Sequence, residues 1–102
     1  MSTIAIIRYQ VRAEAAEENQ RLVEKVYAEL AAGEPGGLRY ATFRLDDGVT
    51  FVHVALTEGA GDPLRTASAF QEFQRGIGDR VVPGTLTRGE AALVGAYRFL
   101  GV

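Results

Sequence analysis

The dipeptide Asp47-Gly48 lies between two stretches of alternating apolar and other residues, and it constrains the fold more than any other feature. A type I′ hairpin turn needs positive φ angles at both central residues, and Asp-Gly is a preferred pair for it. The turn therefore predicts two antiparallel strands, at residues 38–45 and 50–57. With an even-length loop, Phe43 pairs with Val52 and Thr42 pairs with His53.

This register gives the predicted hairpin two different faces. One face is apolar and consists of Ala41, Phe43, Leu45, Val52, Val54 and Leu56. The other mixes aromatic and polar side chains and consists of Tyr40, Thr42, Arg44, Phe51 and His53. An odd-length loop would scramble both faces, and a buried face specifies register strongly, so the even loop is favoured. We expect the apolar face to pack under the helices and the mixed face to remain uncovered.

The rest of the chain supplies two further strands and two helices. Residues 3–11 alternate as a strand, and residues 13–32 have helical periodicity that ends at Gly33 and Pro35. Asp62 and Pro63 are typical of a helix start. The second helix should bury Ala67, Phe70, Phe73 and Ile77 and end near Gly76 or Gly78. Residues 58–62 would be a flexible lip, and residues 93–100 the fourth strand. The order βαββαβ predicts an α+β, ferredoxin-like domain over residues 1–102: a four-stranded antiparallel sheet with two helices on one face.

Composition narrows the class of protein. The chain has 102 residues, 47% of them hydrophobic, which suits one domain with a modest core. No apolar run approaches the ~20 residues that cross a bilayer, and the start lacks the basic region of a signal peptide. With no cysteine and a net charge of −2, the chain suits a reducing cytoplasm and offers no basic surface for nucleic acid. We therefore expect a cytoplasmic protein without nucleic-acid or membrane partners.

An uncovered sheet face that carries aromatic side chains would be an interaction surface. A second copy of the same surface covers it most simply, which predicts a two-fold homodimer with its sheets face to face. A cavity could remain between the two sheets, lined by the polar residues of the mixed face. This interpretation makes the dimer interior the expected ligand site.

Three stretches resemble the dimeric α+β barrel superfamily, in particular small proteins near the antibiotic-biosynthesis-monooxygenase (ABM) family. They are IAIIRYQV, LRYATFRLDDGVTFVHVAL and SAFQEFQRGI, and the resemblance extends from about Ile4 to Phe99. The superfamily includes oxygenases, isomerases, haem-degrading enzymes and stress proteins. The resemblance therefore implies the fold and the dimer, and leaves the activity open.

The chain departs from the family's catalytic patterns. Cofactor-free monooxygenases of this family use an Asn, a Trp and a Tyr, and haem-degrading relatives use an Asn on strand one and a His on the second helix. Here Trp is absent, Asn19 is the only Asn, and the second predicted helix has no His. Haem degradation is therefore not expected. Monooxygenation would need Tyr40, His53 and Arg44 to replace the usual residues.

His53, the only histidine, could act as a general base or simply be hydrogen-bonded inside an interface. Arg44 could hold a substrate anion or pair with an acidic side chain, and Arg8 repeats that argument more weakly. Tyr40 and Phe51 could sandwich an aromatic ligand or form interface core. Thr42 completes the candidate ligand-binding set.

The other polar residues indicate less chemistry. Asn19 falls at the edge of the predicted helix stripe and is interpreted as a boundary residue. Turn formation and helix capping explain three of the four acidic residues Asp46, Asp47, Glu58 and Asp62. Neither a metal nor a cofactor is therefore predicted. The leading hypothesis is a small dimeric protein that binds an aromatic or polyketide-like ligand. The alternatives are a cofactor-independent monooxygenase or isomerase that uses His53 and Arg44, and a non-catalytic dimerisation or regulatory module.

Overall fold

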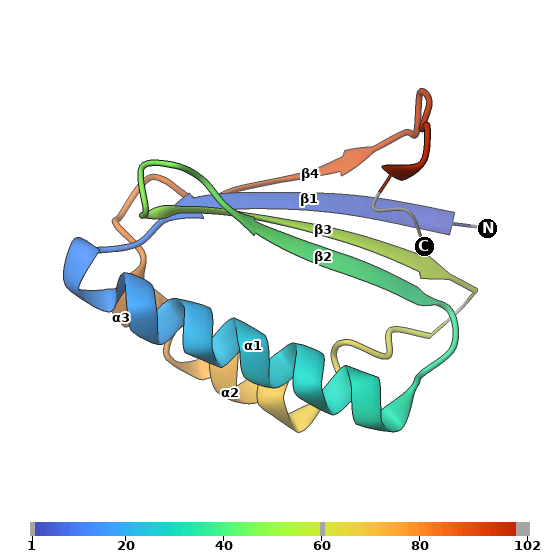
Figure 1. Ribbon diagram of the computed structural model, residues 1–102, viewed down its shortest axis with the longest axis horizontal. Coiled ribbons are helices and arrows are strands. Elements are labelled where there is room, and N and C mark those ends of the chain that lie inside the picture. The colour runs from blue at the N-terminus through green and yellow to red at the C-terminus, as the bar shows by residue number, and fades with distance from the viewer. Residues whose placement is uncertain (1, 60, 100–102) are drawn as a thin grey trace.

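The computed structural model describes residues 2–59 and 61–99. Four strands form one antiparallel sheet in the order β2-β3-β1-β4, and the helices lie together on one side of it (Figure 1). The predicted ferredoxin-like fold is confirmed. The elements are β1 (Ser2–Gln10), η1 (Ala13–Ala15), α1 (Ala16–Gly33), β2 (Leu38–Arg44), β3 (Thr50–Glu58), α2 (Ser68–Arg75), α3 (Ile77–Arg80) and β4 (Thr87–Ala91).

The register of the hairpin is confirmed, although its turn differs from the predicted type. Thr42 pairs with His53, and Phe43 pairs with Val52. The loop is longer than a two-residue turn, because the backbone bonds of Leu45 with Gly48 and Thr50 close it, and Gly48 alone in it has positive φ, +77°. Its even length preserves the register.

The Asp47 carboxylate organises this loop. It accepts hydrogen bonds from the backbone N–H of Val49 at 2.9 Å and of Thr50 at 2.8 Å, and from the Thr50 hydroxyl. These bonds, the one with the Thr50 hydroxyl first, hold the pKa of Asp47 below its ordinary value. The aspartate therefore acts through side-chain bonds rather than through a positive φ angle.

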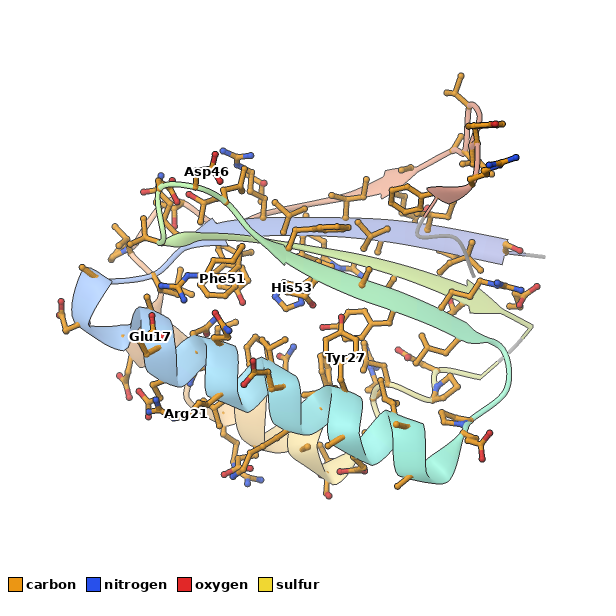
Figure 2. All side chains as sticks on the ribbon, viewed as in Figure 1. Glu17, Arg21, Tyr27, Asp46, Phe51 and His53 are labelled. Carbon is orange, nitrogen blue, oxygen red and sulfur yellow. The ribbon has the colours of Figure 1, made fainter. Side chains whose placement is uncertain are left out.

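The two faces of the sheet are assigned in the opposite sense to the prediction. Tyr40, Phe51 and His53 point towards the helices, and Figure 2 shows Phe51 and His53 between β3 and α1. Phe51 and His53 are 1% and 4% exposed, whereas Ile6 and Phe43 on the other face are 39% and 38% exposed. The mixed face is buried because its aromatic rings pack on the helices and its polar atoms bond to one another. The apolar face is left uncovered.

Both helices begin differently from the prediction. The first turn of the predicted helix 13–32 is the 3-10 helix η1, and α1 follows it. Residues 63–66 form turns, so α2 begins at Ser68 rather than next to Asp62. The carboxylate of Glu29 on α1 accepts the N–H groups of Ser68 and Ala69 and the Ser68 hydroxyl. A tertiary contact therefore caps α2 and decides its first residue.

The predicted fourth strand at residues 93–100 is wrong. The strand that pairs with β1 is β4, in which Ala91 lies opposite Ile4 and Thr87 opposite Arg8. Residues 93–99 form no strand, and Leu100 lies outside the described residues. Their apolar side chains are largely exposed: Leu93 69%, Val94 101%, Tyr97 82% and Phe99 64%. The prediction rests on the apolar character of residues 93–100, but the segment that pairs with β1 is the more polar stretch just before them.

Within the described residues, no helix combines the length and apolar character needed to cross a lipid bilayer. The packing between the sheet and the helices centres on Tyr9, Val23, Val26, Phe51 and Phe73. Residue 60, part of the predicted flexible lip, lies outside the described residues, as do residues 1 and 101–102.

Candidate functional site

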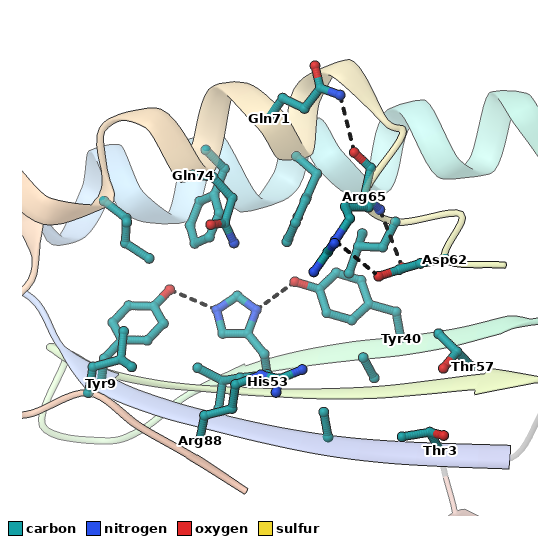
Figure 3. Close-up of a pocket in the computed structure, with 18 residues that line it drawn as sticks. Thr3, Tyr9, Tyr40, His53, Thr57, Asp62, Arg65, Gln71, Gln74 and Arg88 are labelled. Carbon is teal, nitrogen blue, oxygen red and sulfur yellow. Dashed lines mark hydrogen bonds and ion pairs between the residues drawn. The ribbon is translucent and has the colours of Figure 1, made fainter. Parts of the chain in front are cut away.

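A partly enclosed cavity of about 760 Å³ lies between the inner face of the sheet and the helix α2. Strands β1, β2 and β3 supply Tyr9, Tyr40 and His53 to its wall, and α2 supplies Phe70 and Phe73 (Figure 3). The aromatic rings follow one another in contact. His53 lies 5.3 Å from Tyr9, 5.9 Å from Tyr40 and 5.6 Å from Phe73 between ring centroids. The cavity therefore has a largely aromatic lining.

Both ring nitrogens of His53 are engaged. Its Nε2 lies 2.7 Å from the Tyr9 hydroxyl, and its Nδ1 lies 2.6 Å from the Tyr40 hydroxyl. The Thr42 hydroxyl lies 3.1 Å from the same Nδ1 and 2.7 Å from the hydroxyl of Tyr27. Figure 3 shows Tyr9, His53 and Tyr40 in a row along one side of the cavity. The imidazole is thus held between two phenols.

Burial governs the protonation of these groups. It lowers the pKa of His53 to about 4, so the ring is neutral at physiological pH. Burial also raises the pKa of Tyr9 to about 12, although the hydrogen bond from Asn19 and the charge of Arg80 partly offset it. The pKa of Tyr40 is raised in the same way. A neutral imidazole between two neutral phenols is a hydrogen-bonding wall, with no charge to offer a ligand.

The row continues into the helices. The amide nitrogen of Asn19 donates to the Tyr9 hydroxyl at 3.0 Å, and Arg80 Nε donates to the Asn19 amide oxygen at 2.9 Å. Asn19 is fully buried and Arg80 is 5% exposed. The Arg80 guanidinium also donates to the Phe73 carbonyl at 2.9 Å and stacks on the Phe73 ring. One chain of hydrogen bonds therefore runs from α3 through α1 to three strands.

The structure separates the residues predicted as a site. His53 and Tyr40 line the cavity, and Thr42 supports His53 from the same face. Phe51 is buried in the core, stacked on Tyr9 at 5.9 Å, and lies outside the cavity lining. Arg44 and Arg8 also lie outside that lining.

Arg44 and Arg8 occupy other positions on the sheet. Arg44 forms an ion pair with Glu17 at 2.9 Å and donates to Gln20 and the Gly48 carbonyl. Arg8 pairs with Val52 and belongs to the outer face, so it does not share a face with Arg44. The two arginines therefore do not meet at the cavity, and Arg44 contacts an acidic side chain of its own chain.

Sequence reasoning missed Tyr9, Asn19 and Arg80. The prediction of Asn19 as a boundary residue at the edge of the helical stripe is wrong, because Asn19 is fully buried. The buried residues of α1 are Ala16, Asn19, Val23 and Val26, whose spacing of three and four puts Asn19 in the centre of the stripe. A polar residue at the centre of a buried stripe indicates a specific partner, and this signal was present in the sequence.

The rim of the cavity is more polar than its wall. Arg65, Gln71, Gln74 and Arg88 lie there, and Arg65 contacts Asp62 at 3.7 Å (Figure 3). Among residues 2–59 and 61–99, no cluster of three or more His, Asp or Glu side chains has the arrangement of a metal site. The arrangement is suited to enclosing a flat, mainly apolar molecule that has a few polar atoms.

The buried state of His53 predicts a specific dependence of stability on pH. Its pKa is about 4 in the folded chain and 6.5 when unperturbed, so between these values the unfolded state binds more protons. The free energy of unfolding should be highest near neutral pH and fall by about 3 kcal/mol between pH 6.5 and pH 4 because of this residue. Urea unfolding at several pH values measures it. His53→Gln should lack this part of the decline, and identical declines in both proteins would contradict the burial.

Comparison by sequence finds no match, among either protein-family models or curated proteins. Comparison of structures does find similar proteins. Rv0793 from Mycobacterium tuberculosis is 17% identical with a TM-score of 0.73, and the alignment covers 94% of this chain and 98% of that one. SnoaB, a cofactor-independent oxygenase from Streptomyces nogalater, is 19% identical with a TM-score of 0.64, over 93% and 95% of the two chains.

A third solved structure, described as an antibiotic biosynthesis monooxygenase, is 19% identical with a TM-score of 0.67 and is matched over its full length and 93% of this chain. The likeness in each case extends over almost the whole of both chains. At these identities it concerns the arrangement of the backbone and not the residues of a site. The chain therefore has the fold of the antibiotic biosynthesis monooxygenase proteins.

Proposed function

We propose that this protein binds a small aromatic or polyketide-like molecule in the cavity between its sheet and its helices. The observation that carries the proposal is the aromatic wall, in which two phenols and an imidazole are arranged in one row. This places the ligand site within one subunit, on the opposite side of the sheet from the predicted cavity between two sheets.

The dimensions and chemistry of the cavity support such a ligand. Its volume of about 760 Å³ is within the range of small-molecule sites. Phe70 and Phe73 can stack on a planar ring, while the hydroxyls of Tyr9 and Tyr40 can orient its polar atoms. His53 is neutral and already bonded at both nitrogens, which favours binding over proton abstraction by this residue.

A cavity-filling substitution tests the binding proposal. Ala55 lines the floor of the cavity on β3, so Ala55→Phe should occupy the space of a ligand. With 1-naphthol as the probe, fluorescence titration should show binding to the natural protein and at least tenfold weaker binding to Ala55→Phe. The matched control is Ala28→Phe on the exposed side of α1, which should bind as the natural protein does. Equal affinities for Ala55→Phe and the natural protein would contradict the proposal.

A second candidate function is cofactor-independent oxygenation of the bound ligand. It is favoured by the fold shared with SnoaB, itself described as a cofactor-independent oxygenase, together with the tyrosine and histidine side chains of the cavity. In this function Tyr40 and His53 would position a phenolic substrate, and Arg44 would take no part because it lies outside the cavity. The third alternative, a module that only dimerises or regulates, predicts neither binding nor turnover.

Oxygen uptake distinguishes oxygenation from binding. One 1-naphthol and one O₂ would give one 1,4-naphthoquinone and one water, with no added metal or organic cofactor. If the chain only binds 1-naphthol, oxygen uptake should not exceed the uncatalysed rate. Uptake with formation of the quinone, lost in Tyr40→Phe, would replace the binding function with the second candidate. An oxygen electrode and absorbance of the quinone measure the two quantities.

The chain also forms a homodimer through the outer face of its sheet. Ile4, Ile6, Ala41, Phe43, Val52, Val54 and Leu56 share this face according to the strand pairing. Ile6 and Phe43 are more than a third exposed, as is Leu45 beyond the end of β2, and the apolar segment 93–99 is also uncovered. In a two-fold dimer the same face of each copy meets its counterpart, so a second copy covers both exposed apolar surfaces at once.

Sedimentation measures the dimer directly. The natural protein should sediment as a dimer at micromolar concentration, because association removes the outer face from water. Ala41→Glu places a charge in the middle of that face and should give monomers, because the carboxylate would be buried without a partner. Ala28→Glu on the exposed side of α1 is the matched control and should remain dimeric. A monomeric natural protein would contradict the interface.

A further inference from the structure

The chemistry of Arg80 fixes the direction of the hydrogen-bond row. A guanidinium donates and cannot accept, so the atom of Asn19 that lies 2.9 Å from Arg80 Nε has to be the amide oxygen. The amide nitrogen of Asn19 is then turned to the Tyr9 hydroxyl, 3.0 Å away, and donates to it. The orientation of this amide therefore follows from its partner and requires no choice between its oxygen and nitrogen.

The direction of the row is determined in the same way from Tyr9 to His53. The Tyr9 oxygen accepts from Asn19, and its own hydrogen needs an acceptor, which His53 Nε2 provides at 2.7 Å. If Nε2 carried the proton instead, the Tyr9 oxygen would accept twice and its hydrogen would face no acceptor among the described hydrogen bonds. Since a buried donor without an acceptor is costly, Nε2 is the unprotonated nitrogen. The neutral ring then carries its hydrogen on Nδ1.

We propose that Asn19 and Arg80 are positioning residues that hold His53 in its Nδ1–H form and so make Tyr40 a hydrogen-bond donor to the ligand. The Nδ1–H group donates to the Tyr40 oxygen at 2.6 Å. Tyr40 keeps its own hydrogen for a second acceptor: the hydroxyl of Thr42, its hydrogen-bond partner, or, in the complex, an oxygen of the ligand. This part rests on the proposed ligand site and narrows its ligand to aromatic molecules with a carbonyl or similar acceptor oxygen.

The surroundings of Arg80 are built to hold its guanidinium in place. The ion pairs of the described residues do not include Arg80; its partners are the Asn19 amide oxygen and the Phe73 carbonyl, and its charge lies over the Phe73 ring. Gly76 leaves room for it, because a Cβ there would lie 2.7 Å from an Arg80 nitrogen. A buried cation bonded to neutral acceptors is well suited to orienting dipoles along the row.

Nitrogen NMR of the ring tests the direction, and His53 gives one unambiguous spin system because it is the only histidine. At pH 7 the natural protein should show a protonated Nδ1 and a bare Nε2. Asn19→Asp should reverse the row, because the carboxylate accepts from both Arg80 and the Tyr9 hydroxyl, and Tyr9 then accepts from Nε2–H. The control Gln10→Glu makes the same chemical change on an exposed side chain next to Tyr9 and should retain Nδ1–H.

Two results would overturn the proposal. One is an Nε2–H ring in the natural protein, which is measurable even if the Asn19→Asp chain does not fold. The other is a folded Asn19→Asp protein that keeps Nδ1–H. Neither measurement needs a ligand, so the direction of the row can fail while the proposed ligand site stands.

A matched pair of probes tests the ligand preference. 1-Tetralone and tetralin differ in one carbonyl group, so the ratio of their affinities reports the donor from Tyr40. The natural protein should favour 1-tetralone, and Tyr40→Phe and Asn19→Asp should each reduce that ratio about five- to tenfold while tetralin binding changes little. An unchanged ratio in both variants would overturn the role of Tyr40. Absence of binding by either probe to the natural protein would instead count against the proposed ligand site.

Discussion

The hydrogen bond between Tyr9 and His53 is the contact on which the rest of the site depends. It joins β1 to β3 on the face that the helices cover, and it has a partner at each end: Asn19 on the α1 side and Tyr40 on the β2 side. A polar group in this position is tolerated because each of its neighbours completes its hydrogen bonds, and the described buried side chains leave no nitrogen or oxygen without one. Removing one member would leave its direct neighbours short of a hydrogen-bond partner in a largely buried part of the site.

The sequence was sufficient for the fold and for the register, and the reasons are local. Alternation in β2 and β3 and the even loop at Asp47 determine which residues oppose each other, whatever covers the sheet. The choice of the buried face is not local. It was predicted from apolar content, which favours the face with Phe43 and Val54. The structure buries the face with Tyr40 and His53, because rings with matched polar atoms lose little when they leave water together.

The difference between local interactions and contacts with distant residues also explains the other wrong predictions. Asn19 is polar, so its sequence alone suggests the surface. It is buried because its amide bonds to Tyr9 and Arg80. The start of α2 depends on Glu29, which lies far away in the sequence. The fourth strand was assigned to the more apolar segment, although pairing with β1 selects residues 87–91. In each case the deciding partner comes from a distant part of the chain.

Because His53 lies under the helices, the two faces of the sheet have different surroundings. The inner face forms the wall of a cavity, and the outer face leaves Ile6 and Phe43 exposed. The most direct measurement of this arrangement is the NMR titration of the His53 ring proton, which is a single resonance because the chain has one histidine. We expect a midpoint near pH 4, because burial of the ring lowers the pKa of His53 to about that value. A midpoint near 6.5, the value of an unperturbed ring, would place His53 in water and contradict the account.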